Sequence, residues 1–212
     1  MKKKAFFIAA IISGLLLITN THLQHPLGDN LFELISLSPW TKANQNGLHL
    51  PVILGLVFLL IGIAGTVRLY RPRYPKVQSR VILICIVFVI LFPLATEQFM
   101  FLLKHNSKGI ESVDLLTKNS NCNFQTTENA VKANCSFTIL NYGKEGQVSI
   151  RPVLEDSNNI SFDMITISVS PHTKASFATT FIGSRSNDAS YWGQTSNPSF
   201  EVEVRGQSKL FE

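Results

Sequence analysis

Two long apolar stretches in the first half of the chain limit what it can fold into. They run from Leu50 to Val67 and from Val81 to Leu103, and neither has a charged residue in its middle. A helix of about 20 apolar residues crosses the hydrocarbon core of a bilayer, and in lipid a helix satisfies its own backbone hydrogen bonds. The sequence therefore predicts transmembrane helices over residues 50–70 and 81–104.

A third apolar stretch, Ala5 to Thr19, follows the cluster Lys2, Lys3 and Lys4. Its charge and length are typical of a signal peptide, but the following "NTHLQHPLGDN" lacks the small-residue pattern of a cleavage site. We expect residues 1–20 to remain as a short transmembrane anchor, with cleavage as the alternative. Three crossings then precede the polar second half of the chain.

The stretch "RLYRPRYPKVQSR", from Arg68 to Arg80, holds five cationic side chains and no acid between the two long apolar runs. Lysine and arginine in short loops stay on the cytoplasmic side of a membrane. The N-terminal lysine cluster and the loop 71–80 are therefore expected inside, whereas residues 21–49 and 110–212 are expected outside. This pattern predicts a multi-pass protein of the cell membrane with an extracytoplasmic C-terminal domain.

Residues 110–212 carry short runs that alternate apolar and polar, separated by turns such as "NYGKEG" and "SPHTK". About seven such runs in one domain predict an antiparallel β-sandwich. Cys122 and Cys135 lie on neighbouring candidate strands in the half expected outside the cell, where thiols become oxidised. We therefore expect a disulfide between them.

The stretches "CSFTILNYGKEGQVSIRPVL" and "ISVSPHTKASFATTFI" resemble bacterial immunoglobulin-like and CARDB-type adhesion modules. In those modules one strand ends in Asn-x-Gly, and a later strand ends in a Pro-containing turn before a Thr/Phe-rich strand. The resemblance implies an immunoglobulin-like sandwich that serves in adhesion or as a spacer.

A long polar loop, from Gly183 to Ser199, carries Tyr191 and Trp192. Loops on a rigid scaffold often bind partners, and tyrosine and tryptophan are favoured anchors at interfaces. These two residues are candidates for partner binding. The alternative is that Trp192 folds back and caps the sandwich core.

Three features of the membrane half suggest contacts. Small residues on one face of the second long helix predict close packing, either within the chain or in a homo-oligomer: Gly55, Gly62 and Thr66. The loop 21–49 is expected to form a short interfacial helix around Leu31–Leu37, followed by Trp40 as an anchor. Imidazoles suit zinc or copper, so a metal site is an alternative to scattered interfacial histidines at His22, His25, His49 and His105.

Function is expected to be non-enzymatic, because no nucleophile elbow, phosphate loop, H-E-x-x-H or paired C-x-x-C occurs in the sequence. No cofactor is expected. The net charge of +5 comes largely from the basic segments beside apolar runs, which argues against a nucleic-acid partner. The sequence favours a membrane-anchored protein that presents its sandwich to another envelope or membrane protein. The alternatives are an accessory subunit or sensor of a membrane complex, and a metal-handling protein.

Overall fold

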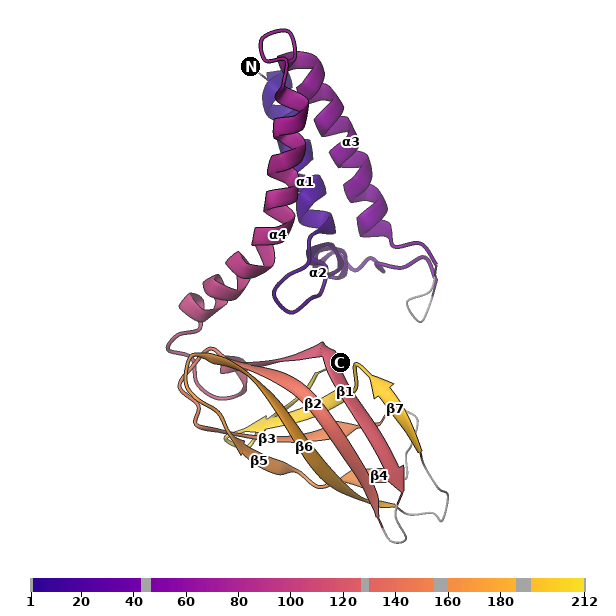
Figure 1. Cartoon of the computed structure of the whole chain (residues 1–212), viewed down its shortest axis with the longest axis vertical. Helices are drawn as coiled ribbons and strands as arrows, with labels where there is room; N and C mark the ends of the chain where they lie inside the picture. Colours follow the sequence, from indigo (N-terminus) through magenta and orange to yellow (C-terminus); the bar gives the residue numbers. More distant parts are fainter. Residues whose placement is uncertain (1, 43–46, 127–129, 155–159, 186–191, 212) are drawn as a thin grey trace. The chain divides into compact units, whose positions relative to one another are not determined.

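The computed structural model describes residues 2–42, 47–126, 130–154, 160–185 and 192–211. Its contacts divide the chain into two compact units, Met1–Glu97 and Gln98–Glu212, and each is described by itself. Helices make up the first unit and antiparallel strands most of the second (Figure 1).

The helical part contains α1 (Lys2–Ile18), α2 (Leu27–Leu34), α3 (Leu50–Tyr70) and α4 (Val77–Leu103), of which α4 ends in the second unit. Within the described residues, α3 and α4 are long and apolar enough to cross a membrane, which confirms the two long helices predicted from the sequence. Helix α1 has 17 residues and is shorter than those two. A third crossing is not shown by its length.

Small residues let α1 and α3 approach closely along one face. A Cβ atom added to Gly62 would lie 2.8 Å from the backbone nitrogen of Ile11, and one added to Gly14 would lie 2.7 Å from the carbonyl oxygen of Gly55. The buried residues of α3 are Pro51, Gly55, Gly62 and Thr66. Gly55 and Gly62 thus pack against α1 of the same chain, and a homo-oligomer through this face stays a prediction.

Replacing Gly62 with leucine is expected to force α1 away from α3, because the new side chain would meet the α1 backbone. Overpacking of this kind costs about 1–3 kcal/mol. Thermal unfolding of the detergent-solubilised protein should show the loss. Ala64→Leu is the matched control, since Ala64 is exposed on α3, and equal losses in the two variants would contradict this packing.

Helix α2 begins earlier than the predicted apolar run, directly after Pro26. Gly28 allows α2 to lie close to the end of α1 and the start of α3, because a side chain at this position would collide with the Leu17 carbonyl and with Pro51. Asp29 pairs with His49 at 2.7 Å, beside the start of α3. The other side of α2 and the residues after it leave apolar side chains uncovered, with Leu34 80% and Ile35 61% exposed.

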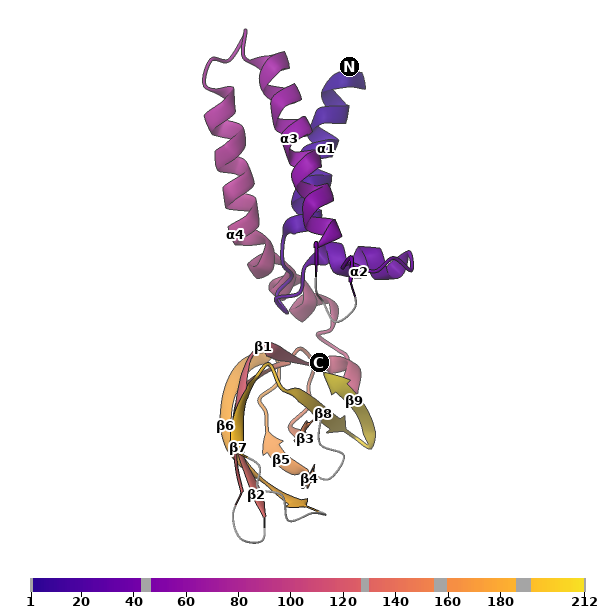
Figure 2. The same cartoon turned by 90° about the vertical axis from the view of Figure 1, so that its right-hand side faces the viewer.

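The second unit folds into two antiparallel sheets after a single 3₁₀ turn, η1 (Ile110–Ser112). The five-stranded sheet has the order β4-β6-β2-β1-β7, and the four-stranded sheet has the order β5-β3-β8-β9. Figure 2 shows the two sheets as facing layers. The strands are β1 (Val113–Thr126), β2 (Val131–Asn141), β3 (Gln147–Val153), β4 (Ile160–Phe162), β5 (Ile165–Ser168), β6 (Thr173–Arg185), β7 (Trp192–Ser196), β8 (Ser199–Val204) and β9 (Gln207–Phe211).

Aromatic side chains fill the core between the sheets. Phe137 on β2 is 2% exposed, and its ring centroid lies 5.2 Å from that of Phe200 on β8 in the opposite sheet. Phe181 on β6 and Phe124 on β1 are fully buried in the same cluster. The alternation of β2, buried at every second residue from Val131 to Ile139, follows from the two-residue period of a strand. The predicted all-antiparallel β domain is confirmed.

Candidate functional site

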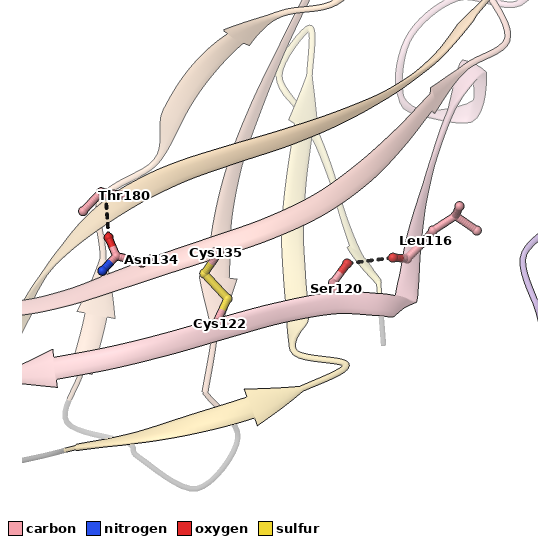
Figure 3. Close-up of a disulfide and its surroundings, with 6 residues drawn as sticks. All are labelled: Leu116, Ser120, Cys122, Asn134, Cys135 and Thr180. Carbon is pink, nitrogen blue, oxygen red and sulfur yellow. Dashed lines mark hydrogen bonds between the residues drawn. A yellow bond between two sulfur atoms is a disulfide. The ribbon is translucent and has the colours of Figure 1, made fainter.

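The disulfide predicted between Cys122 and Cys135 is present, and it lies inside the core (Figure 3). The two residues face each other directly on β1 and β2, so the bond joins neighbouring strands of one sheet. Antibody domains instead bridge their two sheets. Cys122 is 0% and Cys135 3% exposed, so reductants meet this bond only when the sandwich opens.

Next to the disulfide, β1 is interrupted between Leu116 and Asn121, where its register with β2 shifts. The Ser120 hydroxyl donates a hydrogen bond of 2.7 Å to the Leu116 carbonyl across this bulge (Figure 3). Beyond the bulge, β1 pairs with β7 as well as β2. The bulge therefore marks the point on β1 beyond which this strand is paired on both sides, with β2 and with β7.

The predicted aromatic pair, Tyr191 and Trp192, lies where β7 begins. Tyr191 falls outside the described residues. The backbone of Trp192 begins β7 and pairs with Gln125 on β1. Partner binding by these two residues stays a prediction.

A metal site was only an alternative for His22, His25, His49 and His105, and among the described residues no group of three or more His, Cys, Asp or Glu could hold a metal ion. His49 pairs with Asp29 and packs against the Trp40 ring at 4.5 Å. His105 stacks on His172 at 4.0 Å within the second unit. The backbone N–H of His22 donates to the Thr96 hydroxyl at 3.1 Å, and His25 accepts a bond from Thr21 through its backbone carbonyl.

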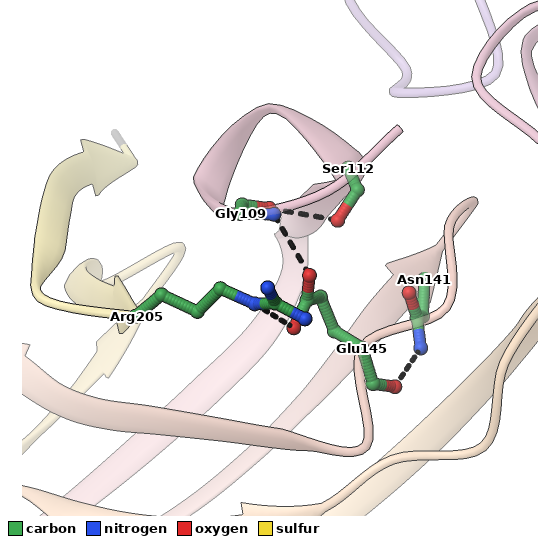
Figure 4. A network of polar contacts seen from close by, with 5 residues as sticks. All are labelled: Gly109, Ser112, Asn141, Glu145 and Arg205. Atoms are coloured by element: carbon green, nitrogen blue, oxygen red, sulfur yellow. Dashed lines mark hydrogen bonds and ion pairs between the residues drawn. The ribbon is translucent and has the colours of Figure 1, made fainter. Parts of the chain in front are cut away.

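A buried carboxylate, Glu145, ties three segments of the second unit together (Figure 4). Its Oε1 accepts a hydrogen bond of 2.8 Å from the Gly109 N–H, and its Oε2 accepts one of 2.9 Å from Arg205 Nε. Its backbone carbonyl accepts a bond of 2.7 Å from the Asn141 side chain. Glu145 is 4% exposed, so this network fixes the segment that enters the sandwich. The sequence reasoning missed it because the three partners are far apart along the chain.

Burial alone would raise the pKa of Glu145, but the hydrogen bond from Gly109, the hydrogen bond and charge of Arg205, and the charge of Lys108 lower it below its usual value. A lowered folded-state pKa contributes stability that is fully present above the unfolded pKa, about 4.3 for glutamate, and is lost as the pH falls through the folded value. We expect the sandwich to lose stability in acid below that pH.

Glu145→Gln is the test of that pH dependence. The amide keeps an acceptor for Gly109 but loses the charged contact to Arg205, which costs about 1.5 kcal/mol at neutral pH. Urea unfolding of the solubilised protein between neutral and acidic pH should show a smaller acid loss in this variant. The same acid loss in both proteins would show that Glu145 is not the titrating group.

The last residues of α4 and Lys104, which follows the helix, belong to the second unit and contact other side chains of that unit. Phe101 meets the buried Tyr142 edge to face at 5.0 Å. Lys104 lies over the same ring at 5.2 Å and pairs with Asp114 at 3.5 Å. Phe101 and Lys104 therefore pack as part of the second unit.

The outward faces of the two sheets differ in charge. On the four-stranded sheet, Arg151 of β3 pairs with Glu201 of β8 at 2.6 Å, and Glu203 follows on the same face. On the five-stranded sheet beyond the bulge, the outward side chains that the structure describes on β1, β2, β6 and β7 are amides, hydroxyls, one lysine, one alanine and one isoleucine. We name this second surface the amide face: Asn121, Asn123, Gln125, Lys132, Asn134, Ser136, Ala178, Thr180, Ile182, Gln194 and Ser196.

No family model, curated protein or solved structure matches this chain. The resemblance of its second half to immunoglobulin-like adhesion modules stays an expectation.

Proposed function

We propose that this chain is a three-crossing protein of the cell membrane that presents its β-sandwich outside the cytoplasm, where the sandwich binds another envelope component. Its N-terminus and the basic loop between α3 and α4 lie in the cytoplasm. The observation that carries the proposal is that one chain contains both two long apolar helices with exposed surfaces and an antiparallel sandwich with a disulfide.

The uncovered surfaces of α3 and α4 support insertion in lipid. None of the described residues of α4 is buried, although the helix has 27 residues and contains long apolar runs. Leu83, Ile84 and Ile90 are each more than 60% exposed. In water such a surface would far exceed the apolar patches of ordinary soluble proteins, whereas lipid tails cover it.

The packing of α1 on α3 supports a third crossing. Lys4, at the start of α1, lies 5.2 Å over the ring of Tyr70, at the end of α3. At the other end, Gly14 meets Gly55 near the start of α3. The two helices thus run antiparallel side by side, and if α3 crosses the bilayer, α1 lies at the same depths. Its 17 residues give about 26 Å at a rise of ~1.5 Å per residue, so the Lys4 side chain must extend to the interface.

The uncovered apolar side chains around α2 fit the same placement. Because α2 is held beside Leu17 and Pro51, it lies near the ends of α1 and α3. Leu34 and Ile35 would then sit at the outer boundary of the bilayer, as expected for an interfacial helix. The disulfide further favours an oxidising compartment for the second unit.

Deleting residues 110–212 tests the assignment of activity to the sandwich. Partners captured by chemical crosslinking of membranes should disappear with the deletion, while the truncated chain still fractionates with membranes. Capture of the same partners by the truncated chain would place the interaction in the helices and contradict the proposal.

A second candidate is an accessory subunit or sensor, favoured by the contacts of Phe101 and Lys104 that hold the end of α4 on the sandwich. A mechanical force on the sandwich, or a ligand bound to it, would be transmitted to α4 through these contacts. Phe101→Ala would then weaken the response of a partner complex without removing binding, and unchanged signalling would exclude this role.

A further inference from the structure

We infer that the amide face binds a neutral, hydroxyl-rich glycan chain. The inference deepens the proposed function and rests on it, since the face must lie outside the cytoplasm to meet an envelope polysaccharide. Three features of the face support it: a row of facing polar side chains, a hollow beside that row, and the absence of carboxylates among the residues of the face.

Amide side chains lie directly opposite one another across the strands. Gln194 on β7 faces Asn123 on β1, which faces Asn134 on β2, which in turn faces Thr180 on β6. Neighbouring strands lie about 4.8 Å apart, so this row presents polar groups at regular steps across the sheet. Thr180 donates a hydrogen bond of 2.7 Å to Asn134 Oδ1, which orients that amide with its NH₂ group as a donor.

The next row across the sheet carries small side chains, which leave a hollow beside the amides. Ser136 and Ala178 face each other there, next to Asn121. Together with Asn134, Cys135, Thr179 and Thr180 they line a shallow, open cavity of about 410 Å³. Because Ser136 and Ala178 are small and the hollow is open to solvent, it offers a place for a ring-sized group beside the amides.

The chemistry of the face suits a sugar better than other ligands. An amide offers donors and an acceptor together, and a serine or threonine hydroxyl does both, which matches sugar hydroxyls that also donate and accept. No Asp or Glu occurs on the amide face as defined above, and Ile182 is the one large apolar side chain among those residues, whereas the centre of a protein interface is usually apolar. Lys132 is its one cation, too little charge to specify an acidic polymer.

The expected affinity for one oligosaccharide is weak, because exposed polar groups give up water contacts on binding. Tight binding to a long polysaccharide would instead come from many copies of the protein held in one membrane. Such multivalent binding fits the proposed role, in which the sandwich binds an extended component of the envelope.

The test uses the full chain in lipid nanodiscs, titrated with the β-1,4-linked hexamers of glucose and of N-acetylglucosamine. Methyl NMR signals of Ala178 and Thr180 should shift, and that of Thr166, on the outward face of β5, should not. The double variant Asn123→Ala/Gln194→Ala removes two facing amides and should weaken binding about tenfold. The matched control Gln147→Ala/Ser168→Ala removes a facing polar pair from the other sheet and should bind as the parent does.

Asn134→Asp separates recognition from folding, because the carboxylate still accepts the Thr180 bond but has lost the amide donors. It should weaken binding while leaving the unfolding midpoint unchanged. Three results would overturn the inference: no shifts with either hexamer on the order of 10 mM, equal binding by the double variant, or binding of dextran sulfate alone through Lys132. In each case an externally accessible sandwich would leave the proposed function standing, so the two failures are distinguishable.

Discussion

Replacing Phe137 with alanine is expected to lower the free energy of unfolding of the sandwich by about 3–5 kcal/mol, the usual cost of emptying a buried aromatic site. Phe137 is 2% exposed and touches aromatic rings from both sheets, including Phe181 and Phe200. Those neighbours are themselves held in strands, so they cannot collapse fully into the cavity. Urea unfolding of the solubilised full chain, followed by its β-sheet circular dichroism, measures the loss.

Phe177→Ala is the matched control for this prediction. Phe177 faces Phe137 across the β2–β6 pair, yet it is only partly buried at the border of the core. It should lose clearly less stability than Phe137. Equal losses would mean that the two sheets do not enclose Phe137 as described.

Removing the disulfide with Cys122→Ala/Cys135→Ala is expected to cost about 3 kcal/mol. The bond closes a loop of 13 residues in sequence separation, and closing a loop restricts the unfolded chain. Both cysteines are buried in the core, so the parent protein should keep its bond in mild reductant until urea opens the sandwich. Thiol labelling across a urea series follows both events.

Cys85→Ser is the control, since Cys85 is the free cysteine and lies on α4. It should leave the sandwich's unfolding midpoint unchanged. If the alanine pair unfolds at the parent's urea concentration, the disulfide does not support the fold.

The two long apolar helices were the most predictable part of this fold because their signal is local. The length and continuous apolarity of residues 50–67 were enough to predict α3, and the small residues Gly55 and Gly62 predicted its buried face. Strand alternation and the pairing of Cys122 with Cys135 were readable for the same reason: each depends on near neighbours in the sequence.

Features made by distant residues were not predictable. The contacts of Glu145 with Gly109 and Arg205 depend on how three separate segments meet. The amide face depends on strand order and register, which place β7 beside β1 although most of the domain separates them in sequence. Alternating amides in "NSNCNFQT" of β1 were visible in the sequence, but only the sheet order aligns them with those of β2 and β7.

Side-specific cysteine labelling tests the placement of the sandwich most directly. In a Cys85→Ser background, Ser79→Cys puts a thiol just before the second long apolar run, and Ser208→Cys puts one on the exposed surface of β9. A membrane-impermeant maleimide applied to intact cells should label Ser208→Cys at once and Ser79→Cys only after lysis. Labelling of Ser79→Cys in intact cells, with Ser208→Cys protected until lysis, would contradict the account.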